Sequence, residues 1–186
     1  MSGIITDNQG RSSGLMKSAA SGGFTISSTI TVGSGSDTWD ITGIPSTASL
    51  IFVNLQGISI DGGHNPQVRV GHAGGVQTAG CISTSFRQTA ATSVQPTAAT
   101  AGFVMYSAGD AEFLRGHMIL SCKIKAAVSV AEIWTSTHQF YIQDTYWAGG
   151  AGQAIIDADN TPLDRVQLQI YSGGAFDDGT FSIAYI

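Results

Sequence analysis

The sequence predicts an all-β fold, namely an antiparallel β-sandwich of the jelly-roll-like type that follows an extended N-terminal arm. Apolar and polar residues alternate through several segments, which is typical of strands with one buried face. Clusters of glycine, aspartate, asparagine and proline separate these segments, as they do in sandwiches and barrels. No segment has the apolar period of a long helix. We therefore predict an arm at residues 1–23 and a sandwich domain at residues 24–186.

The predicted arm differs from the rest of the chain because it is rich in glycine and serine and holds two larger apolar pairs. The pairs are Ile4 with Ile5 and Leu15 with Met16. A flexible strip with spaced apolar anchors can order on a partner surface, where the new contacts offset the entropy of ordering. We predict that the arm attaches the chain to neighbouring subunits. The alternative is a flexible terminus without a partner.

The first predicted strand covers residues 24–32. Phe24, Ile26, Ile30 and Val32 share one parity, and the other parity is mostly serine and threonine. Strict alternation of this kind predicts that the four apolar side chains face the core.

The segment 50–60 predicts a strand with a bulge. Ile51, Val53 and Leu55 share one face at odd numbers, whereas Ile58 and Ile60 continue on even numbers, and the change falls at Gly57. Because successive side chains in a strand point to opposite faces, a change of parity at a glycine indicates one extra residue in the ladder.

Three later segments, 117–130, 165–171 and 180–186, also alternate and predict strands with one buried face. The longest alternation is 117–130, in which Cys122 falls on the apolar parity. A small buried thiol is the interpretation for Cys122. A disulfide with Cys81, the second cysteine of the chain, is the alternative.

Two segments are predicted as exposed loops. Residues 87–102 are rich in threonine and alanine without periodicity, and long loops of this kind are usually functional. The second loop, residues 144–152, places Tyr146 and Trp147 before the glycine-rich AGGAG, which is predicted as a turn. Exposed aromatic rings can stack on sugars or anchor a protein partner. The candidate receptor or partner contacts are Gln95, Thr97, Tyr146 and Trp147, although Trp147 could instead close one end of the sandwich.

The sequence offers little for catalysis or for metal binding. His64 and His72 have no carboxylate or thiol nearby to complete a zinc site. The chain has no GxSxG nucleophile motif, and its glycine-rich stretches lack the pattern of a phosphate loop. We expect no cofactor, no metal and no enzymatic activity.

Charge and hydropathy limit the partners. Charged residues are 11% of the chain, the net charge is −5, and eight Lys and Arg residues are scattered without forming a basic stripe. Nucleic-acid binding is therefore not expected. No signal peptide and no apolar run long enough for a membrane helix is visible, so no membrane insertion is expected.

Two segments resemble the proteins of tailed-bacteriophage particles, in particular tail fibres. DGGHNPQVRVGHAGGVQTAGCISTS, residues 61–85, is similar to a strand and glycine turn of that module, and TPLDRVQLQIYSGGAFDDGTFSIAYI, residues 161–186, is similar to its closing hairpin. The N-terminal GIITDNQGRSSGLMKS is similar to leaders that these proteins often carry. The resemblance implies a jelly-roll-like sandwich, usually a homotrimer, displayed on a virus particle.

The resulting hypothesis is a structural protein of the virion, made in the host cytoplasm. It would be a tail fibre or a similar appendage that assembles with other virion proteins and contacts a host surface glycan or protein. The main alternative is a trimeric capsid decoration protein that uses the arm to join shell subunits. A lectin or a glycan-active enzyme is a third hypothesis. A closed homotrimer would also protect exposed strand edges from aggregation.

Overall fold

The computed structural model covers most of the chain outside the predicted arm. It describes residues 23–33, 35–88, 94–106, 113–124, 131–143, 146–156, 161–171 and 173–186. The arm residues Ile4, Ile5, Leu15 and Met16 lie outside these ranges.

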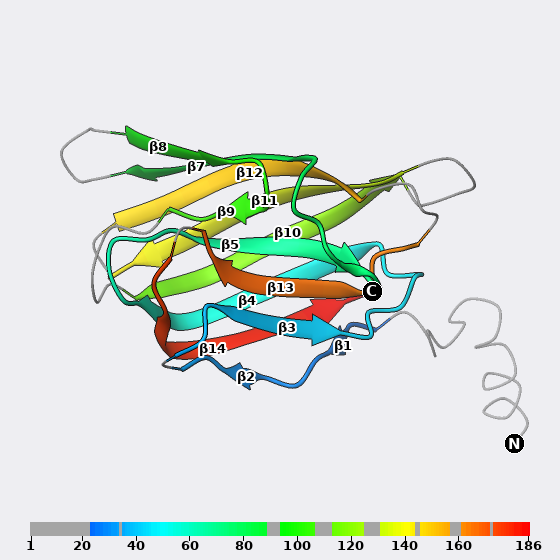
Figure 1. Ribbon diagram of the computed structural model, residues 1–186, viewed down its shortest axis with the longest axis horizontal. Helices are drawn as coiled ribbons and strands as arrows, with labels where there is room; N and C mark the ends of the chain where they lie inside the picture. The colour runs from blue at the N-terminus through cyan, green and yellow to red at the C-terminus, as the bar shows by residue number, and fades with distance from the viewer. Residues whose placement is uncertain are drawn as a thin grey trace, which may run out of the picture.

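The described residues form two antiparallel sheets and contain no helix, so the predicted β-sandwich is confirmed (Figure 1). The larger sheet has nine strands in the order β1-β14-β4-β10-β11-β12-β7-β8, with β2 paired to β14. Its strands are β1 (Thr25–Ile26), β2 (Ile30–Thr31), β4 (Leu50–Ile60), β7 (Cys81–Gln88), β8 (Val94–Ala99), β10 (Leu114–Ile124), β11 (Glu132–Ile142), β12 (Tyr146–Ile156) and β14 (Phe176–Tyr185).

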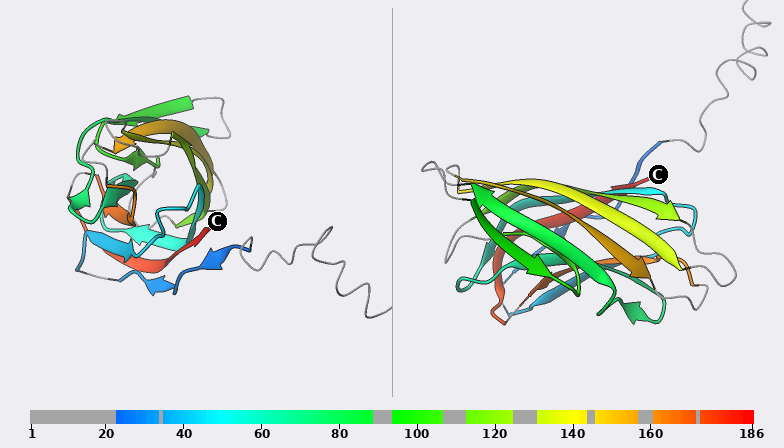
Figure 2. Two further views of the ribbon diagram at one scale, coloured as in Figure 1. Left: turned by 90° about the vertical axis from the view of Figure 1, so that its right-hand side faces the viewer. Right: turned by 90° about the horizontal axis from the view of Figure 1, so that it is seen from above.

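The smaller sheet has five strands in the order β3-β13-β5-β6, with β9 paired to β5. Its strands are β3 (Thr38–Thr42), β5 (Pro66–His72), β6 (Gly75–Val76), β9 (Phe103–Val104) and β13 (Arg165–Ile170). Figure 2 shows that the larger sheet curves around the smaller one. The inner faces of both sheets therefore share one core, and the outer face of the larger sheet is convex.

The bulge predicted at Gly57 is confirmed. Ile58 lies opposite Leu114 in β10, whereas the next residue, Arg115, lies opposite Gln56, so Gly57 is the extra residue of β4. Gly57 has a φ of 65°, a conformation that glycine adopts without steric cost. The bulge lets apolar side chains on both sides of it point into the core.

The other predicted alternations are also confirmed where the structure describes them. Met118 and Leu120 in β10, and Val166 and Leu168 in β13, are fully buried. Trp39 lies in β3 and packs against the core as a partly buried side chain. Cys81 is buried and Cys122 is partly buried, and the two do not form a disulfide with each other.

The prediction for residues 24–32 is wrong in part. The segment forms two short strands, β1 and β2, and Phe24 and Ile26 are 51% and 73% exposed. Ile26 pairs with Ala184, whose neighbours on β14 face the core, so Ile26 points outward. The ring of Phe24 instead packs on the outer surface, edge-on against Phe52 at 5.2 Å between ring centroids.

The prediction of exposed loops at residues 87–102 and 144–152 is wrong, because both segments contain long stretches of strand. Residues 94–99 form β8 at the edge of the larger sheet, and the AGGAG sequence lies in the middle of β12. Glycine is required there because neighbouring groups occupy the space. A Cβ at Gly150 would overlap the carbonyl oxygen of Thr84, and one at Gly152 would lie 2.6 Å from the Ser83 Cβ and 2.9 Å from the Phe103 ring.

Replacing Gly152 with alanine is expected to lower the free energy of unfolding by about 1–3 kcal/mol, the usual cost of overpacking a core. The added methyl group must displace Phe103 or separate β12 from β7. Urea denaturation measures the change. Gly63→Ala is the matched control because a Cβ there meets no atom within 4 Å. Equal stability of the two variants would contradict this account of β12.

Candidate functional site

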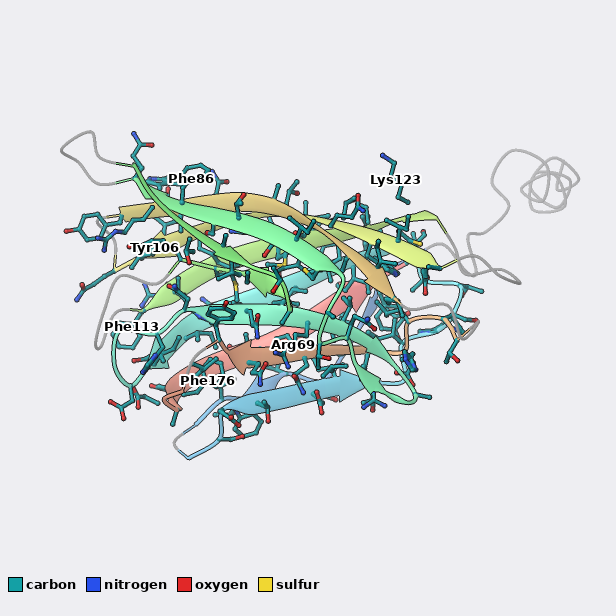
Figure 3. The ribbon with its side chains drawn as sticks, turned by 45° about the horizontal axis from the view of Figure 1, so that its top comes forward. Arg69, Phe86, Tyr106, Phe113, Lys123 and Phe176 are labelled. Atoms are coloured by element: carbon teal, nitrogen blue, oxygen red, sulfur yellow. The ribbon has the colours of Figure 1, made fainter. Side chains whose placement is uncertain are left out.

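Four exposed aromatic side chains lie on neighbouring strands at one end of the larger sheet. They come from β7, β12, β11 and the residue before β10, and we call them the aromatic patch. The patch is Phe86, Trp147, Tyr141 and Phe113, which are 42%, 41%, 45% and 39% exposed. Figure 3 shows Phe86 and Phe113 toward the same end of the sandwich, with Lys123 toward the other end. Their exposure makes this end of the sheet the best candidate for a binding surface.

The strand register assembles the patch. Tyr141 and Trp147 are directly opposite each other in β11 and β12, and their ring centroids are 4.1 Å apart at 49°. Phe86 lies opposite Gly149, where a Cβ would come within 3.2 Å of its ring. The glycine therefore makes room for the phenylalanine ring next to the tyrosine–tryptophan pair.

Two hollows adjoin the patch. The smaller, of about 50 Å³, is lined by Phe113, Arg115, Tyr141 and Gln143.

A shallower depression of about 190 Å³ lies over β10 and β11 and is lined by His117, Ile119, Thr137, His138 and Gln139. His117 and Gln139 are directly paired across the two strands. Imidazole, hydroxyl and carboxamide groups line this depression, and all three can both donate and accept hydrogen bonds.

The four contact residues predicted from the sequence lie in strands and not in loops. Gln95 and Thr97 are in β8 and Tyr146 and Trp147 are in β12, and β7 lies between these two strands. Arg87 in β7 pairs with Gln95 in β8 and with Ala148 in β12. Thr97 lies two residues further along β8, where its hydroxyl accepts a hydrogen bond of 3.3 Å from Asn65. With strands about 4.8 Å apart, β8 and β12 are separated by about 10 Å.

Tyr146 and Trp147 face opposite sides of β12. Trp147 is on the outer face and 41% exposed, so it does not close the end of the sandwich. Tyr146 packs against the core, and its ring lies 5.0 Å from the Arg87 guanidinium, which also lies 5.2 Å from the Tyr106 ring. This cation–π arrangement supports the patch from inside the sandwich.

A Ser–His pair lies beneath the patch, but it is buried. The Ser85 Oγ is 2.9 Å from the His138 Nε2 and accepts a hydrogen bond of 3.0 Å from the Tyr106 amide. Ser85 and His138 are only 1% and 7% exposed. Burial lowers the pKa of His138 to about 4. The pair fastens the segment that follows β9 to the larger sheet, in the same way that Ser83 binds the Val104 amide at 3.0 Å.

Sequence reasoning missed Phe86, Phe113 and Tyr141. Tyr141 belongs to the aromatic-rich stretch from Phe140 to Trp147, and this richness in aromatic residues could have indicated that Tyr141 is part of the site. Phe86 and Phe113 are far from it in sequence, and only the order of strands brings them to the same surface.

Comparison of the chain with protein-family models, curated proteins and solved structures found no match. In the described ranges, no group of three or more His, Cys, Asp or Glu side chains could hold a metal ion. The same part of the chain has no helix with the length and hydropathy of a membrane span.

Proposed function

We propose that this chain is a structural protein of a phage particle, a tail-fibre-type appendage whose sandwich contacts a host-surface molecule through the aromatic patch. The two segments that resemble such proteins contain β5, β6 and most of β7, and β13 with β14. The resemblance, together with the antiparallel sandwich, supports a role in the virion. Attachment through residues 1–23 and the absence of enzymatic activity are parts of the same proposal.

The aromatic patch is the observation that carries the binding role. Aromatic rings bury a large area on contact, and they lose little conformational entropy. The surface around them is also poor in charge. Among the described outward-facing residues of β7, β10, β11 and β12, only Arg115 and Lys123 carry a formal charge. A charge-poor surface with aromatic rings is costly to leave in water and suits contact with another molecule.

Electron microscopy of particles carrying a labelled chain tests the proposal. Label at the tail tip, with few copies per particle, is the expected result. Label spread over the shell in many copies would instead identify a capsid decoration protein. Particles without the chain would overturn the proposed role in the virion.

We also propose that the chain forms a homotrimer, and a second exposed patch supports this. Ile82, Ile133 and Ile155 lie at the opposite end of the same outer face, and we call them the aliphatic patch. Ile82 is 74% exposed and Ile155 is 39% exposed. Aliphatic side chains have no polar group to interact with a small polar ligand, so this patch suits contact with another copy of the chain.

Changing Ile82 and Ile155 to serine together is expected to convert the trimer to a monomer, because the apolar area that drives association is removed. Size-exclusion chromatography with light scattering measures the mass. Tyr171→Ser, which removes an exposed apolar side chain outside the patch, is the control and is expected to remain trimeric. A monomeric unmodified chain would contradict the prediction.

A further inference from the structure

We infer that the aromatic patch and the adjoining depression form one site for a neutral glycan, with a sugar ring on Tyr141 and Trp147 and its hydroxyl groups in the depression lined by His117, Thr137 and Gln139. This inference rests on the proposed binding function and names the class of ligand.

The two parts of the site are contiguous. Gln139 and Tyr141 are two positions apart on the same face of β11, which separates them by about 7 Å. The strands β10, β11 and β12 together span about 10 Å. A short oligosaccharide can therefore reach from the rings into the depression without crossing another element.

The rings offer the apolar half of the site. The C–H face of a pyranose is apolar and flat, and it can pack on an aromatic ring that is large and rigid. The outward-facing residues after Trp147 on β12 are Gly149 and Ala151. Because these residues have little or no side chain, no side chain projects from β12 beside the tryptophan ring, and a ligand has room to pack there.

The depression offers the polar half. Each sugar hydroxyl both donates and accepts hydrogen bonds, and so do the carboxamide of Gln139 and the hydroxyl of Thr137. Of the polar residues that line it, His117, Thr137 and Gln139 are exposed and His138 is buried. No acidic side chain lines the depression, and its basic side chains are the imidazoles of His117 and of the buried His138. Arg115, which lies opposite Tyr141, adds one cation at the edge of the site. A neutral glycan therefore fits the charge of the site better than an anionic polymer, which would need a cluster of cations.

A glycan array and calorimetry test the inference on the full chain. The probes are oligosaccharides of glucose, galactose and mannose, with sialylated and uronate-containing oligosaccharides as the anionic class. Binding to one neutral group is expected. Trp147→Ala and Gln139→Ala are expected to weaken that binding, by about tenfold or more for the aromatic residue and by about three- to tenfold for the amide.

Matched controls separate binding from folding. Gln153→Ala, on the same outer face of β12 but away from the patch, is expected to leave the affinity within about twofold. Trp147→Phe keeps a ring and is expected to retain part of the affinity that Trp147→Ala loses. Thermal unfolding of each variant shows whether the sandwich is intact.

Binding of no glycan, binding of anionic glycans alone, or equal affinity in Trp147→Ala and Gln153→Ala would overturn the inference. Loss of a protein partner in Trp147→Ala, without any glycan binding, would overturn it too and would show that the patch contacts protein. None of these outcomes contradicts the proposed function if electron microscopy still locates the chain on the tail, because the particle images test the role in the virion separately.

Discussion

Replacing Phe103 with alanine is expected to lower the free energy of unfolding by about 3–5 kcal/mol, the range for deleting a fully buried aromatic side chain. Phe103 is 0% exposed and connects the two sheets. Its backbone pairs with Val68 in the smaller sheet, and its ring fills the space left open by Gly152 in the larger one. Removing the ring leaves a cavity between β9 and β12 that the surrounding strands cannot close without breaking their pairing.

Urea denaturation of Phe103→Ala measures this loss. Phe86→Ala is the matched control, because it removes the same side chain from the outer surface, where 42% of the residue is already in contact with water. The control is expected to lose about 1 kcal/mol or less. A Phe103→Ala variant that is no less stable than Phe86→Ala would show that β9 does not hold the sheets together.

The predictions that succeeded concern strands with one buried face. In β10, in β13 and in β4 before Gly57, every second side chain is buried in the core, because each strand turns one face toward it. The bulge at Gly57 could also be predicted from the sequence, because a single extra residue changes the parity of every side chain that follows.

The predictions that failed concern small residues and sheet edges. Glycine usually indicates a turn. In β12, glycine is required instead because the side chains of Phe86, Phe103 and His138 occupy the space that a Cβ would need. That requirement comes from neighbouring strands and leaves no local signal. The edge strand β1 leaves both of its residues exposed, so its sequence need not alternate as that of a central strand does.

The candidate site could be predicted only in part, because some of its residues are close together in sequence and others are brought to it by strand pairing. Tyr146 and Trp147 are adjacent to other aromatic residues in the sequence, which indicated the region. The pairing of β12 with both β11 and β7, which adds Tyr141 and Phe86, depends on long-range register that no local pattern encodes.

Acidification is expected to destabilise the sandwich through His138. The imidazole is buried between β7 and the segment after β9, and its Nδ1 has no hydrogen-bond partner among the described residues. An unpartnered acceptor costs less than an unpartnered N–H, so we assign the proton of the neutral ring to Nε2, which donates to the Ser85 Oγ. Ser85 can then accept from the Tyr106 amide and donate to the Gly149 carbonyl at 3.3 Å. A second proton on Nδ1 would place an uncompensated charge in the core.

The folded chain holds the pKa of His138 at about 4, against 6.5 for the ordinary side chain. The unfolded chain therefore binds more protons between these values, and the free energy of unfolding falls by about 3 kcal/mol as the pH drops from 7 to 4. Denaturation across this range is the measurement. His138→Gln, whose amide can still donate to Ser85, is expected to lose this part of the pH dependence. The exposed control His117→Gln is expected to keep it. Identical pH profiles for the two variants would contradict the assignment, because the carboxylates of the chain titrate equally in both.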